Sequence, residues 1–480
     1  MADEAEVCGG RSPSTEKGRA RSSGGVIEGR VIDDQLRPLA DAKVSAQRVR
    51  GVGSQLEVWP IEAASSPRRG SSWGPTAVTN RLGIYRIEGL PPGPYYVSAI
   101  APNPPQKRPG PGTRLSEAVG YGPTFYPGST TVAYASSVRL RADDEMTGID
   151  IRVEKRRLAR LSGHVSGTRG RLDVEGASVR LAPSAMFGAG RLDAFTGHSA
   201  LAADGAFSIE AVPPGDYVLI ARSVSPLVLR EVARTGSSEP LTRDPGAEFA
   251  TLKVTVNGED VTELELPLSA GGRIAGRITV DGRPYTPGRK YVAVVARPLD
   301  EDATIAGASE VGVTRDGTFE IRGVAGRFIL RVGDIAPDMA LARVELFGRD
   351  VADAGVIVSP RESVSDVTIM LTSSPTELTG RIAKPPADHS PAGPCTVLVF
   401  SDDANQWSLP SSRYVAVTSP QPGGVFSIVG LPPGNYLALA VRDADDLDAI
   451  DPEYLRRVAR LGQKVRLREG ETTAVALALH

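Results

Sequence analysis

The sequence predicts an all-β protein made of about four tandem antiparallel β-sandwich modules, with one short helix in the last module. Two observations lead to this prediction. One block of residues recurs four times, and short runs of alternating apolar and polar residues follow one another to the end of the chain. The 52 Gly and 38 Pro among 480 residues are typical of many strands joined by tight turns.

Each copy of the block opens with a glycine, which is followed by a basic or histidine residue and then a β-branched residue. The opening glycines are Gly29, Gly163, Gly276 and Gly380. They recur at a period of about 110 residues, which is the size of one small sandwich. A strand rich in Ala and Val is expected after each opening, most clearly at residues 37–44.

The centre of the block predicts a strand, a sharp corner and a second strand. Its first copy reads Gly83-Ile-Tyr-Arg-Ile-Glu-Gly-Leu-Pro-Pro-Gly93. Proline presets φ at the corner, and glycine adopts the positive φ that other residues resist. An aromatic residue follows two positions after the last glycine of each copy: Tyr95, Tyr217, Phe328 and Tyr436. We expect these rings to re-enter the core, where the tyrosines can also bond the backbone, as in the tyrosine corner of other sandwiches.

Alternating strands close each copy and set the predicted boundaries. The boundaries divide the chain into a disordered polar tail at 1–23, module one with long inserts at 24–155, module two at 157–269, module three at 271–373 and module four at 375–480. The linkers between the modules are very short. Neighbouring modules are therefore expected to touch and to form a semi-rigid rod.

Module one carries two long inserts, residues 50–76 and 101–131, and loops of this length are usually functional or mobile. They contain the candidate ligand-binding aromatics Trp59, Trp73, Tyr121 and Tyr126. In one interpretation these rings, set among Pro and Gly, line a sugar or peptide groove. In the other, Tyr126 and Phe125 only cover a sheet edge. Sugar binding predicts that some of the rings form an exposed coplanar platform.

Module four contains the clearest helix of the sequence. Pro452 stands in its first turn, and Tyr454, Leu455, Val458 and Leu461 fall on one helical face. We expect this face to pack on the sandwich of its own module, with partner binding as the alternative. Trp407 is expected to anchor a loop.

The residues that catalysis needs do not stand in any recognised pattern. No histidine has a zinc-ligand spacing, and no serine elbow or phosphate loop occurs. We therefore expect no enzyme activity, no cofactor and no metal. A net charge of −2 without a basic stripe argues against nucleic acid. A protein or a glycan is the expected partner, and the oligomeric state is left open.

The chain offers few signals about its compartment. Residues 1–23 contain no apolar signal core, so the chain as written is expected to stay where it is made. No apolar stretch reaches the ~18 residues of a membrane span. The two cysteines, Cys8 and Cys395, cannot form a disulfide framework, and Cys395 is predicted to be a buried core residue.

The repeated block resembles the carboxypeptidase regulatory-like domain, and the resemblance covers nearly the whole chain after residue 24. It implies a prealbumin-like (transthyretin-like) fold, related to carbohydrate-binding-like folds, and a bacterial protein of the periplasm or cell exterior. The match is weakest in module three, where Ala325-Gly326 replaces Pro-Pro-Gly. Residues 344–353 also resemble a segment that recurs in multi-module bacterial proteins. No peptidase domain accompanies the modules, so the resemblance implies no hydrolysis.

Three functions follow from these observations. The first is a non-enzymatic binding or scaffolding role at the bacterial envelope, which the tandem sandwiches favour. The second is carbohydrate binding through the aromatic inserts of module one. The third is an accessory subunit of a separate peptidase.

Overall fold

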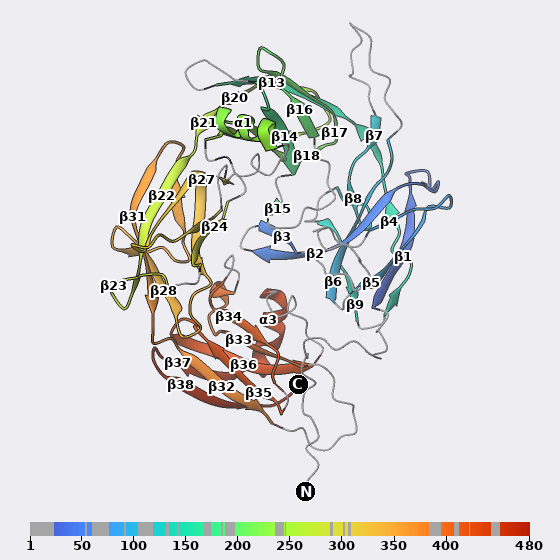
Figure 1. Ribbon diagram of the computed structural model, residues 1–480. Helices are drawn as coiled ribbons and strands as arrows, with labels where there is room; N and C mark the ends of the chain where they lie inside the picture. Colours follow the sequence, from blue (N-terminus) through green and yellow to red (C-terminus); the bar gives the residue numbers. More distant parts are fainter. Residues whose placement is uncertain are drawn as a thin grey trace.

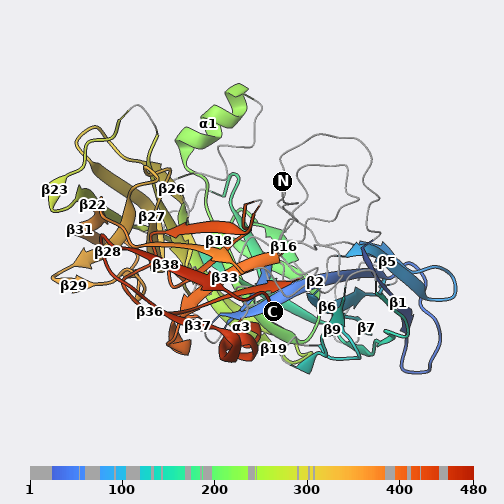
Figure 2. The same cartoon turned by 90° about the horizontal axis from the view of Figure 1, so that it is seen from below.

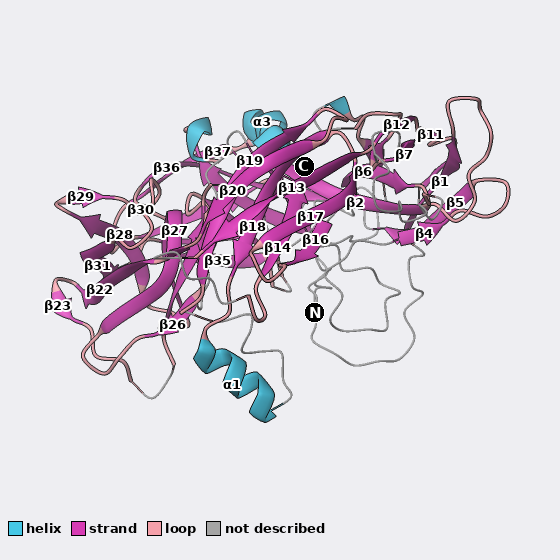
Figure 3. Cartoon of the chain, turned by 90° about the horizontal axis from the view of Figure 1, so that it is seen from above, coloured by secondary structure: helices cyan, strands magenta, loops and turns pink. Residues whose placement is uncertain are grey.

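Four β-sandwiches follow one another along the chain, as the sequence predicts. The computed structural model describes residues 24–480 except 53–54, 60–75, 91–92, 104–118, 131–133, 142–143, 168–173, 184–185, 188–196, 236–243, 245, 289–290, 301–302, 306–308, 384–394, 408–411, 422 and 443–451. Each sandwich is defined here by its buried apolar core, which lies within residues 27–153, 159–268, 274–371 and 378–477, respectively. Strands make up most of the described chain (Figure 3).

The sandwiches are arranged along an arc and not as the semi-rigid rod that the short linkers predict. In Figure 1 they run from sandwich one (blue to cyan) through two (green) and three (yellow to orange) to four (red). The expectation of a rod is wrong because each joint turns the next sandwich relative to the one before.

Sandwich one packs a small sheet, in the order β10-β1-β11 with β5 beside β1, against a larger sheet around β2 and β6. Its strands are β1 (Gly25–Ile32), β2 (Lys43–Val52), β3 (Gln55–Trp59), β4 (Thr76–Val78), β5 (Ile84–Leu90), β6 (Gly93–Ile100), β7 (Val119–Tyr121), β8 (Thr124–Phe125), β9 (Val138–Leu140), β10 (Glu145–Met146) and β11 (Ile151–Arg152). Strand β12 (Lys155–Arg157) leads to the next sandwich.

Sandwich two has the sheets β17-β13-β20 and β16-β14-β18-β19-β21. Its elements are β13 (Ala159–Ser166), β14 (Ser178–Pro183), β15 (Met186–Phe187), β16 (Gly197–Ala200), β17 (Ala206–Val212), β18 (Gly215–Arg222), α1 (Pro226–Thr235), β19 (Glu248–Val256), β20 (Val261–Pro267) and β21 (Ser269–Ala270). Helix α1 stands out from the sheets in both Figure 2 and Figure 3. It corrects the expectation of a single helix in the last module.

In sandwich three one long strand, β27, belongs to both sheets. Its strands are β22 (Gly272–Val280), β23 (Arg283–Pro284), β24 (Ala293–Pro298), β25 (Thr304–Ile305), β26 (Glu310–Gly312), β27 (Thr318–Gly333), β28 (Ala340–Leu346), β29 (Arg349–Asp350), β30 (Val356–Val358) and β31 (Ser363–Thr372). Ala325-Gly326 stands here in place of Pro-Pro-Gly. Without proline every residue can donate to the ladder, so the strand continues through the corner.

Sandwich four has the sheets β35-β32-β38 and β34-β33-β36-β37. Its elements are β32 (Glu377–Ile382), β33 (Cys395–Ser401), η3 (Ala404–Gln406), β34 (Val415–Thr418), β35 (Val425–Val429), β36 (Gly434–Arg442), α3 (Pro452–Val458), η5 (Ala459–Leu461), β37 (Gln463–Leu467) and β38 (Thr472–Leu477). Every residue of β33 is buried, because α3 covers the face of its sheet that points away from the sandwich core.

Two local expectations for sandwich four are confirmed. Leu455 of α3 packs with Phe400 and Leu439 of its own sandwich. Leu461, also predicted on this face, lies in η5 beyond the end of α3 and is exposed. Trp407 anchors its loop, since its indole Nε1 donates to the Ser401 carbonyl oxygen at 2.6 Å and its ring meets Phe400 edge to face.

Cys395 is buried, as expected for a core cysteine, but it is also disulfide-bonded. The other cysteine of the sequence, Cys8, lies outside the described residues.

The first and last strands of each sandwich pair in parallel, which corrects the expectation of purely antiparallel sheets. The pairs are β1 with β11, β13 with β20, β22 with β31 and β32 with β38. Parallel neighbours enter the sandwich at one end and leave it at the other. The chain can therefore pass directly from one sandwich into the next.

This parallel pairing explains the four opening glycines. A Cβ at Gly29, Gly163 or Gly276 would overlap the carbonyl oxygen of Ile149, Leu264 or Val367, respectively. At Gly380 it would overlap the ring of Phe426 in β35 and would lie 2.7 Å from the carbonyl oxygen of Val475 in the parallel strand β38. The glycine is thus required by close approach, not by a turn.

The last strand carries a β-bulge where it passes the opening glycine in sandwiches two and three. Three residues of β13, 161–163, face four residues of β20, 261–264, and β22 and β31 show the same shift. The residue before the close carbonyl has a positive φ: Gly148 (76°), Glu263 (60°) and Asp366 (65°). Sandwich one uses glycine at this point, whereas two and three hold a side chain in the left-handed region.

Glu263→Gly is therefore expected to stabilise sandwich two by about 0.5–1 kcal/mol, because it removes the left-handed strain of an exposed side chain. Urea unfolding of the intact chain measures the change. The control is Glu265→Gly, also exposed and in the same strand but without a positive φ. It should lower stability by about 0.5–1 kcal/mol, and equal signs for the two variants would contradict the explanation.

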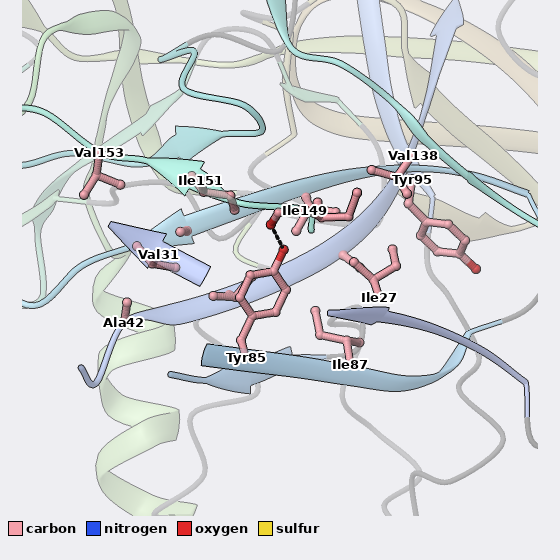
Figure 4. Packing of buried hydrophobic residues seen from close by; sticks show 14 of the residues in the cluster. Ile27, Val31, Ala42, Tyr85, Ile87, Tyr95, Val138, Ile149, Ile151 and Val153 are labelled. Atoms are coloured by element: carbon pink, nitrogen blue, oxygen red, sulfur yellow. Dashed lines mark hydrogen bonds between the residues drawn. The ribbon is translucent and has the colours of Figure 1, made fainter. Parts of the chain in front are cut away.

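The corner aromatics re-enter the cores as predicted. The hydroxyls of Tyr217 and Tyr436 donate to the carbonyl oxygens of Pro213 and Pro432, at 2.9 and 2.6 Å. Burial raises the pKa of both hydroxyls. A further tyrosine, Tyr85, donates to the Ile149 carbonyl oxygen at 2.6 Å and thus bonds β5 to the segment that leads into β11 (Figure 4).

Candidate functional site

The two insert tyrosines that the structure describes are core residues and not an exposed pair. Tyr121 is 6% exposed, and Tyr126 is half-buried against the same core. Asn103 fixes the backbone of Tyr121 through bonds to both its N–H and its carbonyl oxygen. Trp59 ends strand β3 at a point where only the backbone is described, and Trp73 lies outside the described residues.

The insert of sandwich one reaches sandwich two. Strand β3 pairs in parallel with β15, with Leu56 opposite Met186 and Glu57 opposite Phe187. The hairpin β2–β3 points toward the inside of the arc in Figure 1. This insert therefore links two sandwiches through their backbones.

Two further contacts join sandwiches one and two. The linker strand β12 pairs antiparallel with β7, and the Lys155 Nζ lies 5.5 Å from the centre of the Tyr121 ring. Gly122 packs closely against Pro213, the first residue of the corner of sandwich two. A Cβ at Gly122 would lie 2.8 Å from Pro213 Cβ, so the two sandwiches are in direct contact here.

Sandwiches two and three meet through apolar residues and a shared edge. Phe249 of β19 packs with Ala247 and with Ala325 of β27. Strand β21, which leads into sandwich three, pairs with β19. The linker is thus part of a sheet.

The joint between sandwiches three and four is held by a largely buried ionic cluster. Arg413 of sandwich four forms a bidentate salt bridge with Asp353 of sandwich three. Its Nη2 donates to Oδ2 at 2.8 Å, and its Nε donates to Oδ1 at 3.1 Å. Its Nη1 donates to the carbonyl oxygens of Leu341 and Ala342, both at 3.1 Å. Arg413 is only 10% exposed. We call Asp353, Arg331, Arg413 and Tyr414 the joint cluster.

Arg331 completes the cluster from within sandwich three. Its Nη2 lies 3.3 Å from the Asp353 Oδ1, and its Nη1 donates to the Ala352 carbonyl oxygen at 2.7 Å. The guanidinium of Arg413 also lies over the ring of Tyr414. One carboxylate therefore stands between two guanidinium groups, and a bidentate pair of this kind fixes direction as well as distance.

The ionisation of the cluster follows from these contacts. Burial alone would raise the pKa of Asp353, but the hydrogen bond and positive charge of Arg413, with the charge of Arg331, hold that pKa below its usual range. Burial opposes the charge of Arg413, yet its hydrogen bond to Asp353 raises its pKa overall. The carboxylate is thus ionised near neutral pH.

Asp353 and Arg413 were not among the site residues predicted from the sequence. A signal was present, because Asp353 ends the segment 344–353 that resembles a recurring one. Within the described part of the chain, no three His, Cys, Asp or Glu side chains gather as metal ligands, and no helix is long and apolar enough to span a membrane.

Comparisons with known proteins leave the family open. No family model and no curated protein matches the chain. Among solved structures, the chain is similar to the TIE protein of Bacillus anthracis, with 10% identity over 92% of this chain and 68% of that chain and a TM-score of 0.17. A streptococcal ancillary pilin has 9% identity over 67% and 98%, and a minor pilin of Streptococcus agalactiae has 14% over 48% and 99%, both with a TM-score of 0.22. Matches with TM-scores this low do not support a conclusion about the fold or the function of the chain. The resemblance to the carboxypeptidase regulatory-like domain stays a prediction.

Proposed function

We propose that the chain is a non-enzymatic scaffold of the bacterial envelope or cell exterior, whose sandwiches hold binding surfaces at fixed angles to one another. The joints are the observation that carries this proposal. Flexibly linked domains normally move against each other. Here strand pairing joins sandwich one to the linker of sandwich two, and sandwich two to the linker of sandwich three. The largely buried pair Asp353–Arg413 joins sandwiches three and four.

The predicted divisions at 24–155, 157–269, 271–373 and 375–480 remain part of the proposal, with one sandwich in each. The proposed location rests on the resemblance of the repeated block. The disulfide at Cys395 supports it, because disulfides persist in oxidising compartments.

Small-angle X-ray scattering of the intact chain in solution tests the scaffold. We expect one profile, which the curved arrangement of Figure 1 reproduces, and no change in it with salt. A profile that only an ensemble of freely moving sandwiches can fit would contradict a fixed scaffold. Hydrolysis of a peptide library by the purified chain would contradict its non-enzymatic character and favour a peptidase role.

A glycan screen on the same sample separates the proposal from carbohydrate binding. We expect no glycan to bind in a manner that depends on Trp59 or Trp73. Binding that is lost in Trp59→Ala or Trp73→Ala would favour the carbohydrate-binding alternative.

A further inference from the structure

One sheet of sandwich four lacks, on its outward side, the charges that the same sheet carries in the other sandwiches. This sheet, β35-β32-β38, lies on the outer side of the arc (Figure 1). In β35 the side chains of Val425 and Val429 are 39% and 46% exposed. Every other copy of the block has a charged residue in place of Val429, and each forms an ion pair within its own sandwich: Glu88, Glu210 and Arg322.

The neighbouring strands continue this apolar side. Ala474 and Ala476 of β38 are exposed, and they lie opposite Thr379 and Arg381 of the central strand β32. Adjacent exposed apolar residues of this kind indicate an interaction surface. We call the outward side of β32, β35 and β38 the terminal face.

A negative charge lies at one end of the terminal face. The hydroxyls of Ser427 and Thr472 donate to the two carboxylate oxygens of Glu377 at 3.2 and 2.9 Å. These hydroxyls come from the strands on either side of β32. The carboxylate is thus held in place without a positive charge beside it in those strands.

A positive charge lies at the other end. Arg381 follows Glu377 by four residues on the same strand, which separates their Cα atoms by ~13 Å. The residues opposite Arg381 in the adjacent strands are apolar, Val425 and Ala476. In sandwich two the corresponding residue of the last strand is Glu265. The exposed guanidinium of Arg381 therefore has no acidic residue directly opposite it in its own sheet.

The printed registers make the terminal face complementary to itself. A two-fold axis that crosses the strands at Thr379 stacks β32 on the antiparallel β32 of a second copy. Glu377 of each copy then faces Arg381 of the other. Because Val429 lies beside Glu377 and Val425 beside Arg381, the same axis also brings Val429 onto Val425. The contact contains each ion pair and each valine pair twice, as an isologous contact must.

The other face-to-face arrangement is unfavourable. A two-fold axis along the strands would place Glu377 on Glu377 and Arg381 on Arg381. Like charges that meet across a contact reduce its stability, whereas complementary charges fix its register. The charge pattern therefore selects one of the two alignments.

We propose that two copies of this chain associate face to face through the terminal face, about a two-fold axis that crosses β32 at Thr379. Strands of five or six residues cover only ~14 by ~20 Å. This area is well below the ~800 Å² per partner of a standard interface, so the dimer is reversible. The dimer goes beyond the scaffold function and does not depend on it, since a rigid arc and a dimer can each exist alone.

Sedimentation analysis of the full chain over a wide range of concentrations tests the dimer. We expect a monomer–dimer equilibrium with a dissociation constant between about 1 μM and 1 mM. Arg381→Glu and Glu377→Arg should each weaken association at least about 10-fold, because each places like charges opposite one another. The double variant Glu377→Arg with Arg381→Glu exchanges the two charges and should restore association.

Val429→Glu tests the apolar part of the contact. It introduces the residue that sandwiches one and two have at this position, so the sheet should accept it. Association should weaken at least about 10-fold, because a carboxylate then lies against a valine of the other copy.

Arg277→Glu is the matched control. Arg277 follows the opening glycine of sandwich three as Arg381 follows that of sandwich four, and it is also exposed. Reversal of this charge should leave the dissociation constant unchanged. The melting midpoint of each variant at low protein concentration verifies that the chain still folds.

Three results would overturn the dimer. The first is a wild type that remains monomeric at about 1 mM protein. The second is a double charge exchange that binds no better than either single variant. The third is growth into larger assemblies, since a two-fold contact closes at two copies. An equal loss in Arg277→Glu would mean that net charge, and not the terminal face, controls association.

Discussion

Asp353→Ala is expected to destabilise the joined third and fourth sandwiches by about 3–5 kcal/mol. The change removes the carboxylate that both Arg331 and Arg413 contact, and it leaves two largely buried guanidinium groups without a counter-ion. An uncompensated buried charge is much more unfavourable than the loss of an exposed pair. Urea unfolding of the intact chain, followed through the buried Trp407 of sandwich four, measures the loss.

The control for this change is Glu345→Gln. It breaks the surface ion pair between Arg343 and Glu345, two residues of the same strand β28, at 2.9 Å. Exposed pairs of this kind contribute about 0–1 kcal/mol. If Asp353→Ala had no larger effect than this control, the joint cluster would not hold the two sandwiches together. Scattering from Asp353→Ala should also indicate motion between sandwiches three and four.

The effect of Asp353→Ala should depend on pH. The folded pKa of Asp353 is depressed, so its contribution to stability is fully present above the unfolded value of about 3.9. The contribution is lost as the pH falls from there through the folded pKa. The difference between wild type and variant should therefore be constant above about pH 5 and should shrink below about pH 4. A difference that grows on acidification would contradict the assignment.

Local patterns predicted the parts of the fold that local physics determines. The corner of Gly434 and Tyr436, the helix at Pro452 and the loop anchor Trp407 each depend on residues close in sequence, and each is found as expected. Helix α1 was not predicted, although apolar residues such as Val228 and Val232 recur in it at helical spacing. It stands out from the sheets, and none of its side chains is fully buried.

Long-range features could not be predicted in the same way. Asp353 and Arg413 are 60 positions apart and meet only because the two sandwiches are turned toward each other. The parallel pairing of β22 with β31 joins strands that lie at opposite ends of the sequence of sandwich three. The burial of Tyr121 likewise depends on how the inserts fold back. A single sequence carries no direct signal for such pairings.

The opening glycine of the repeat lies where the first and last strands of a sandwich approach most closely. Its replacement is the second change for which we expect a large effect. Gly276→Ala is expected to destabilise sandwich three by about 3 kcal/mol, at the upper end of overpacking effects. The new methyl group would overlap the carbonyl oxygen and Cβ of Val367 in the adjacent strand. A backbone atom cannot rotate away as a flexible side chain can, so β22 and β31 must separate and weaken their hydrogen bonds.

Gly333→Ala is the matched control for Gly276→Ala. Gly333 ends β27 in the same sandwich, has no positive φ, and no described atom lies within 4 Å of the position that its Cβ would take. Alanine there should be neutral or stabilising by up to about 1 kcal/mol, because it reduces the freedom of the unfolded chain. Calorimetry of the two variants separates the explanations. Similar melting shifts would mean that glycine is retained for another reason. A large loss for Gly276→Ala alone would mean that sandwich three needs its opening glycine so that β22 and β31 can approach each other.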